Sequence, residues 1–243
     1  MKKTILILAT VLLGISSANA QFFGNKRVNG NGEITTQNRN TSSYDEVSLQ
    51  GSMDVELVAG TEGKLKVEAE SNLQEYILTE VEAGVLKISV EKGVNLNPSR
   101  NNEIKIIVPF KDLEGVYLTG SGDIRTTDMI KASSFTMKVT GSGDMKIEVE
   151  ANNLEGSVTG SGDILLRGKA NDFTCNVNGS GDVKAYDLKA QNVVARISGS
   201  GDIQVYASKS LDARVAGSGD VTYRGNPEKE NFKTAGSGSI TSN

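Results

Sequence analysis

The sequence predicts an all-β protein, most of it a right-handed parallel β-helix, a solenoid in which a single chain winds through successive coils. Three observations predict this fold. The tetrad Gly-Ser-Gly-Asp recurs at spacings of 18 to 21 residues, a period typical of solenoids. Apolar residues on both sides of each tetrad fall on even offsets from its first glycine, which is the period of a strand. Residues 116–243 show no 3.6-residue period of a helix.

The first 43 residues precede the predicted fold. Lys2 and Lys3, an apolar run over 5–15 and the small residues "SSANA" are typical of a secretory signal peptide cleaved after Ala20. The apolar run is shorter than the roughly 20 residues of a membrane-spanning helix. A buried N-terminal helix is the competing interpretation. Residues 21–43 are polar and rich in Gly and Asn, so we expect a flexible leader there.

Residues 44–118 are predicted to form a β cap that includes a degenerate first coil. With Gly51 as zero, Val47, Leu49, Met53 and Val55 fall on the even offsets, and Asp54 takes the place of the aspartate. Alternating runs between 64 and 110 predict further strands, "EAG" at 82–84 suits a hairpin turn, and 72–76 suits one helical turn. Such a cap covers the open end of a solenoid, and 44–243 then form one domain.

The repeats occupy residues 119–243. Six complete tetrads begin at Gly120, Gly141, Gly160, Gly179, Gly199 and Gly217, and the variant "GSGS" begins at Gly236. We expect strands of four to six residues, two or three in each coil, with equivalent residues stacked about 4.8 Å apart. The even offsets would form inward columns, such as the one two residues before each glycine, which holds Leu118, Val139, Val158, Val177, Ile197 and Val215.

The tetrad itself has two interpretations. In the structural one, glycine permits a corner with positive φ or a close backbone approach, and Ser and Asp side chains bond nearby N–H groups. In the functional one, carboxylates about 5 Å apart repel by about 3 kcal/mol at an effective dielectric of 20, and backbone N–H groups, basic neighbours or cations relieve the repulsion. Calcium is the cation whose oxygen ligands fit. The predicted column holds Asp123, Asp144, Asp163, Asp182, Asp202 and Asp220.

Composition narrows the function. The chain has no His, which excludes a Ser-His-Asp triad and His-based metal sites, and no cofactor motif is present. Without residues 1–20 the net charge is −6, which argues against nucleic acid. The single Cys175 fits an inward column as a small apolar filler. The enzyme alternative is a polysaccharide lyase or glycosidase that uses paired aspartates with Lys or Arg. The aromatic residues that could stack on sugar rings are few and scattered, namely Tyr186, Tyr206 and Tyr223, and Tyr223 falls on an inward offset.

The segments "YDEVSLQGSMDVELVAG" (44–60) and "LEGVYLTGSGDI" (113–124), followed by serial "GSGD" turns, resemble the head GIN domain family of auto-transporter adhesins from Bacteroidetes-type bacteria. The resemblance covers about residues 40–240. It implies a β-helix similar in architecture to pectin-lyase-like folds without their catalytic residues, a role in adhesion, and a homotrimer. The six corner glycines would lie near the subunit contact, where a strip without Cβ atoms admits a second backbone.

The functional hypothesis is therefore a non-catalytic, exported cell-envelope or surface interaction protein, an adhesin with a surface glycan or protein ligand. Its predicted location is the periplasm, the outer surface or the medium. Envelope maintenance or stress sensing is a further alternative to adhesion.

Overall fold

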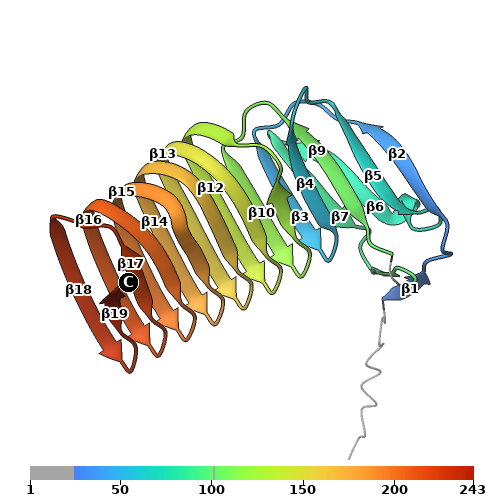
Figure 1. The fold of residues 1–243 in the computed structure, drawn as a ribbon. Coiled ribbons are helices and arrows are strands. Elements are labelled where there is room, and N and C mark those ends of the chain that lie inside the picture. The colour runs from blue at the N-terminus through green and yellow to red at the C-terminus, as the bar shows by residue number, and fades with distance from the viewer. Residues whose placement is uncertain (1–24, 101) are drawn as a thin grey trace, which may run out of the picture.

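The computed structural model describes residues 25–100 and 102–243, and the regular structure there is strand apart from one short 3-10 helix. The strands wind into a β-solenoid of about 7 turns. Its coils lie side by side from an N-terminal cap to the C-terminus (Figure 1). The predicted fold class is thus confirmed. No helix among these residues is long and apolar enough to cross a membrane. The predicted signal peptide lies outside the described residues.

In the middle of the solenoid each coil is one long strand that bends once and ends at a corner glycine. These strands are β12 (Ile130–Gly141), β13 (Met145–Gly160), β14 (Ile164–Gly179), β15 (Val183–Gly199) and β16 (Ile203–Gly217). They are 12 to 17 residues long, so the prediction of four- to six-residue strands is wrong. The reason is that parallel pairing with the neighbouring coil continues around the bend. The last coil is divided into β17 (Val221–Arg224), β18 (Lys229–Gly236) and β19 (Ile240–Ser242).

The predicted inward columns are present and form the core. Parallel pairing places Val139, Val158 and Val177 in register on successive coils, and each is at most 1% exposed. Full burial of one such side chain stabilises the fold by about 1.5–3 kcal/mol. Cys175 is buried in the neighbouring column of small residues, and burial raises the pKa of its thiol. Buried apolar side chains therefore stack on one another from the first coil to β17, whereas β18 in the last coil is exposed along its length.

Stacking of the coils also explains both glycines of the tetrad. Gly160 has a φ of +123°, and a Cβ built on it would lie 2.3 Å from the carbonyl oxygen of Gly141. That oxygen accepts the N–H groups of Ser161 and Gly162 at 2.8 and 3.1 Å. A Cβ on Gly162 would lie 2.1 Å from the carbonyl oxygen of Gly143. Only glycine fits where successive corners approach so closely.

The first coil and the cap agree with the predicted organisation. Strands β3 (Glu46–Gly51) and β4 (Asp54–Ala59) pair in parallel with β10 (Gly115–Gly120) and β11 (Ile124–Thr126). The cap strands are β5 (Lys64–Glu70), β6 (Ile77–Glu82), β7 (Val85–Val90) and β9 (Lys105–Phe110). The pairs β6–β7 and β5–β9 are antiparallel. Ala83 and Gly84 have φ of +50° and +82° in the predicted hairpin turn, and the predicted helical turn is the 3-10 helix Gln74–Tyr76.

The prediction of a flexible leader is wrong for residues 25–43. Strand β1 (Lys26–Asn29) pairs with β8 (Val94–Asn97), and β2 (Ile34–Asn40) pairs with β5. The carboxylate of Glu70, only 1% exposed, accepts the N–H of Gly32 and both the N–H and the hydroxyl of Ser99. This segment is held by main-chain pairing and a buried carboxylate instead of an apolar face. Residues 21–24 lie outside the described residues.

Candidate binding groove along the aspartate column

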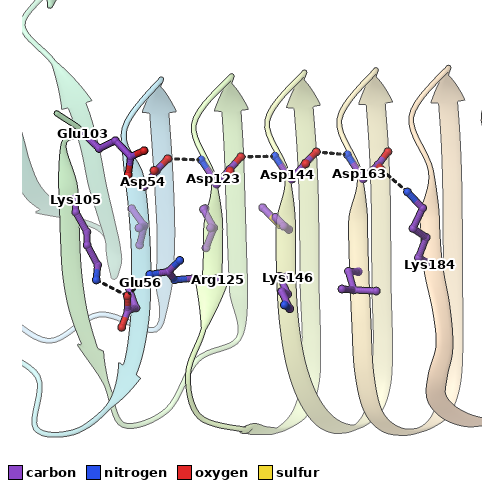
Figure 2. A pocket seen from close by; sticks show the side chains of 14 residues that line it. Asp54, Glu56, Glu103, Lys105, Asp123, Arg125, Asp144, Lys146, Asp163 and Lys184 are labelled. Atoms are coloured by element: carbon purple, nitrogen blue, oxygen red, sulfur yellow. Dashed lines mark hydrogen bonds and ion pairs between the residues drawn. The ribbon is translucent and has the colours of Figure 1, made fainter. Parts of the chain in front are cut away.

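The six predicted aspartates stack in one column, which Asp54 of the first coil extends. Figure 2 shows the first four members, Asp54, Asp123, Asp144 and Asp163. The N–H of Asp144 donates to Oδ1 of Asp123 at 3.0 Å, and the N–H of Asp163 donates to Oδ1 of Asp144 at 2.8 Å. The same bond repeats along the column until Ser239, whose N–H donates to Asp220 at 2.7 Å. We call this series, from Asp54 to Asp220, the aspartate column.

The hydrogen bonds give the column a structural role. Each carboxylate accepts an N–H from the next coil, which is one of the three means of relieving the repulsion between neighbouring aspartates. Within residues 25–100 and 102–243, no three His, Cys, Asp or Glu side chains converge as a metal site. Calcium binding by the column stays a prediction.

A second outer row runs beside the column, two residues further along each strand. It holds Glu56, Arg125, Lys146, Leu165 and Lys184, so basic side chains lie next to the carboxylates. The ammonium of Lys184 lies 2.6 Å from Oδ2 of Asp163 and 3.3 Å from Oδ2 of Asp182. The hydrogen bond to Asp163 and the charges of both aspartates raise the pKa of Lys184.

The two rows line a groove of about 440 Å³ that extends from β9 and the first coil to Lys184 on the fifth coil (Figure 2). At that end Glu56 is held by the ammonium of Lys105 at 2.6 Å and the guanidinium of Arg125 at 2.8 Å. Hydrogen bonds from Lys105 and then Arg125 lower the pKa of Glu56. Oδ2 of Asp123 and of Asp144 accepts no hydrogen bond from the described part of the chain. The groove therefore offers free carboxylate oxygens beside fixed cations.

The carboxyl of Asp54, at the end of the groove next to β9, has a raised pKa. Its partial burial, followed by the charges of Asp123 and Glu103, raises its pKa, while the N–H bond from Asp123 and the charge of Arg125 act in the opposite direction. A raised carboxyl pKa is typical of a general acid. Asp54 is therefore the residue that the enzyme alternative would use as a general acid.

The tyrosines considered for sugar stacking are arranged differently from that expectation. The guanidinium of Arg224 lies 4.1 Å from the ring centre of Tyr186, and the ammonium of Lys189 lies 3.9 Å from that of Tyr206. Tyr223 is 8% exposed and belongs to the core. One face of each outer ring is thus covered by a cation, and none of the three lines the groove.

The corner glycines do not need a second subunit to explain them. The backbone that approaches each of them is the preceding coil of the same chain, as at Gly179, where a Cβ would lie 2.3 Å from the carbonyl oxygen of Gly160. The physical reason given for placing the subunit contact at these corners is therefore lost. The trimer itself stays a prediction.

A second set of polar ladders, which was not predicted from the sequence, runs at the bend opposite the corners. The side-chain amide of Asn171 donates to Asn152 at 3.0 Å, and that of Gln191 donates to Asn171 at 2.9 Å. Beside them Asn192 donates to Asp172 at 2.8 Å. Spacings of 19 and 20 residues, equal to those of the tetrads, were the available signal.

Comparison with known proteins places the chain in a family. The family described as "Putative auto-transporter adhesin, head GIN domain" matches residues 43–227. A putative lipid binding protein from Parabacteroides distasonis ATCC 8503 is 33% identical, with a TM-score of 0.74 over 90% of this chain and 100% of that chain. No protein with a curated description matches.

Two further solved structures share the fold. A putative adhesin from Bacteroides fragilis NCTC 9343 has a TM-score of 0.82 at 23% identity over 89% of this chain and 100% of that chain. A putative adhesin from Parabacteroides distasonis ATCC 8503 has a TM-score of 0.73 at 21% identity over 90% of this chain and 100% of that chain. The family match covers most of the solenoid and its first coil. The chain belongs to the head GIN domain family, the one described as "Putative auto-transporter adhesin".

Proposed function

We propose that this chain is a non-catalytic, exported surface interaction protein, an adhesin that binds a hydroxyl-rich glycan in the groove along the aspartate column. The observation that carries the proposal is that the free carboxylate oxygens of Asp123 and Asp144 line the same groove as the cationic side chains of Arg125 and Lys146. Carboxylates accept hydrogen bonds from sugar hydroxyls, and ammonium and guanidinium groups donate to them. The family and its adhesin-named structural neighbours support the same class of function.

The solenoid suits binding because it holds these groups in fixed positions. Each aspartate of the groove is tied to the next coil through Oδ1, as Asp144 is to Asp163 at 2.8 Å. A ligand that lies along the solenoid axis would meet an aspartate on each successive coil. Preorganised groups of this kind reduce the entropy lost on binding.

The test compares two substitutions in the same column. In Asp144→Asn the amide oxygen still accepts the N–H of Asp163, so the fold is kept while the charge of the groove is lowered. Asp202→Asn makes the same change outside the groove. An immobilised set of neutral, amino and acidic oligosaccharides would be probed with the wild type and both variants. We expect the wild type and Asp202→Asn to bind a common neutral glycan and Asp144→Asn to bind it at least tenfold more weakly.

Two outcomes would contradict the proposal. Equal losses in Asp144→Asn and Asp202→Asn would mean that the groove is not the site. Binding to phosphatidylcholine vesicles without binding to glycans would favour a lipid ligand, as the name of the Parabacteroides distasonis relative has it for that protein.

The enzyme alternative is tested in the same material. A polysaccharide lyase or glycosidase would use the carboxyl of Asp54, whose pKa is raised, together with that of Glu103. Release of reducing ends or unsaturated sugars from a polysaccharide, abolished by Asp54→Asn, would replace the binding proposal by a catalytic one.

The location and the oligomeric state are parts of the proposal. An adhesin has to be exported to the cell surface, in agreement with the predicted signal peptide. We propose a homotrimer, for which light scattering at micromolar concentrations gives the mass, and a monomeric mass would reject it. Deletion of the gene with assays of surface attachment and of envelope integrity separates adhesion from envelope maintenance.

A further inference from the structure

A second groove, of about 1090 Å³, runs beside the bend opposite the corners. Parallel register places one outer residue of each coil along it. These residues are, in order from the N-terminal end, Lys131, Glu150, Lys169 and Lys189. All four are exposed. The row thus ends in two lysines on adjacent coils.

Lys169 and Lys189 are direct cross-strand partners. Like charges in that position repel, and the usual remedy is a nearby carboxylate. Within residues 25–100 and 102–243, no carboxylate oxygen lies within 4.0 Å of either ammonium. The nearest carboxylate in the row is that of Glu150, the cross-strand partner of Lys169 on the side away from Lys189. Asp172 and Asp187 have other partners, since Asp172 accepts the amide of Asn192 and Asp187 lies 3.7 Å from Arg167.

The position of one ammonium is fixed. Lys189 lies over the ring of Tyr206 at 3.9 Å from its centre, an interaction that orients the cation without neutralising it. Next to the lysines runs the amide ladder of Asn152, Asn171 and Gln191, which also lines the groove. The C-terminal end of the groove therefore combines two adjacent cations with a row of fixed amide groups, whereas the carboxylates of Asp45, Glu46, Asp112 and Glu114 line its N-terminal end.

We propose that the C-terminal end of this groove is a second binding site, for an anionic glycan that carries carboxylate groups. The two lysines bind the carboxylates of successive sugars, and the amide ladder bonds their hydroxyls. The chain has a net charge of −4, so it does not attract polyanions in general, and binding of one depends on a local site such as this. The proposal goes beyond the aspartate-lined groove and does not depend on it.

The test uses an oligogalacturonate of about ten sugars and isothermal titration at low salt. The variant Lys169→Gln/Lys189→Gln removes the two adjacent cations. The control Lys138→Gln/Lys233→Gln removes the same charge from two exposed lysines away from the groove. We expect the wild type and the control to bind, the first variant to bind at least tenfold more weakly, and added salt to weaken binding by the wild type.

Three results would overturn the proposal. These are equal losses in the two double variants, equal binding of a neutral galactan of the same length, and equal binding of poly-L-glutamate, which would show a site for any polyanion. Asp144→Asn is expected to leave this binding intact, so failure here is distinguishable from failure of the proposed function.

Discussion

Replacement of a corner glycine by alanine tests the stacking that holds the solenoid together. In Gly160→Ala the new Cβ would lie 2.3 Å from the carbonyl oxygen of Gly141, a distance that real contacts do not reach. Alanine at a φ of +123° also carries backbone strain of about 1–3 kcal/mol. Displacement of the oxygen weakens the bonds from Ser161 and Gly162, each worth about 0.5–1.5 kcal/mol. The free energy of unfolding should therefore fall by about 2–6 kcal/mol.

The matched control lies in the same strand. A Cβ on Gly156 would meet Phe173 at 3.7 Å and Met137 at 3.8 Å, which are ordinary contacts. Gly156→Ala should be neutral or stabilise by up to about 1 kcal/mol, since alanine restricts the unfolded chain. Cys175 is the partner of this glycine on the next coil and shows that the column admits a larger side chain.

The assay is urea unfolding followed by circular dichroism. A loss of 2 kcal/mol or more lowers the midpoint by about 1 M, because m-values are about 1–3 kcal/mol/M. The reasoning would be refuted if Gly160→Ala unfolded within about 0.5 kcal/mol of the wild type, or if both variants lost the same stability.

Three further predictions concern the core, the cap and the cysteine. Val177→Asp, which buries an unpaired charge, should lower the thermal midpoint severely, whereas Asn176→Asp on the outer side should change it little; equal effects would mean that the assigned facing is wrong. Burial raises the pKa of Glu70, but hydrogen bonds from Ser99 and Gly32 outweigh burial, so the net pKa is lowered. The ionised carboxylate therefore stabilises the fold above the unfolded pKa of about 4.3, and this stabilisation is lost as the pH falls through the folded pKa. Hydrogen exchange of residues 25–43 should become faster over that pH range in the wild type, whereas Glu70→Gln should show no such pH dependence. The Cys175 thiol should react with a thiol reagent only in denaturant, and rapid reaction of the native chain would contradict its burial.

The repeat could be predicted from the sequence because its physical causes are local. Val139 and Val158 stand 19 residues apart and two before their glycines, and pairing in register turns that spacing into a column. The aspartate column followed from the same spacing. The sequence did not show which groups relieve the repulsion between the carboxylates of the column. Backbone N–H groups are present at nearly every position, and the sequence does not show where they point.

The N-terminal segment could not be predicted by the same reasoning. Ile34–Asn40 reads as a polar run, and strand β2 forms because its backbone pairs with β5 and Arg39 donates to the carbonyl oxygen of Gln74 at 2.7 Å. Long-range contacts of this kind leave no periodic signal. The juxtaposition of Lys189 and Tyr206 was hidden for another reason, since the pairing of β15 with β16 shifts register between Ala185 and Lys189.

Because every corner binds the one before it through the same bonds, the number of coils is not fixed by either end of the molecule. An in-frame duplication of residues 161–179 would insert one more rung and lengthen the body by about 4.8 Å, with both ends untouched. Relatives of this chain can thus differ in the length of the solenoid, and of the rows along it, through duplication of one coil-length repeat.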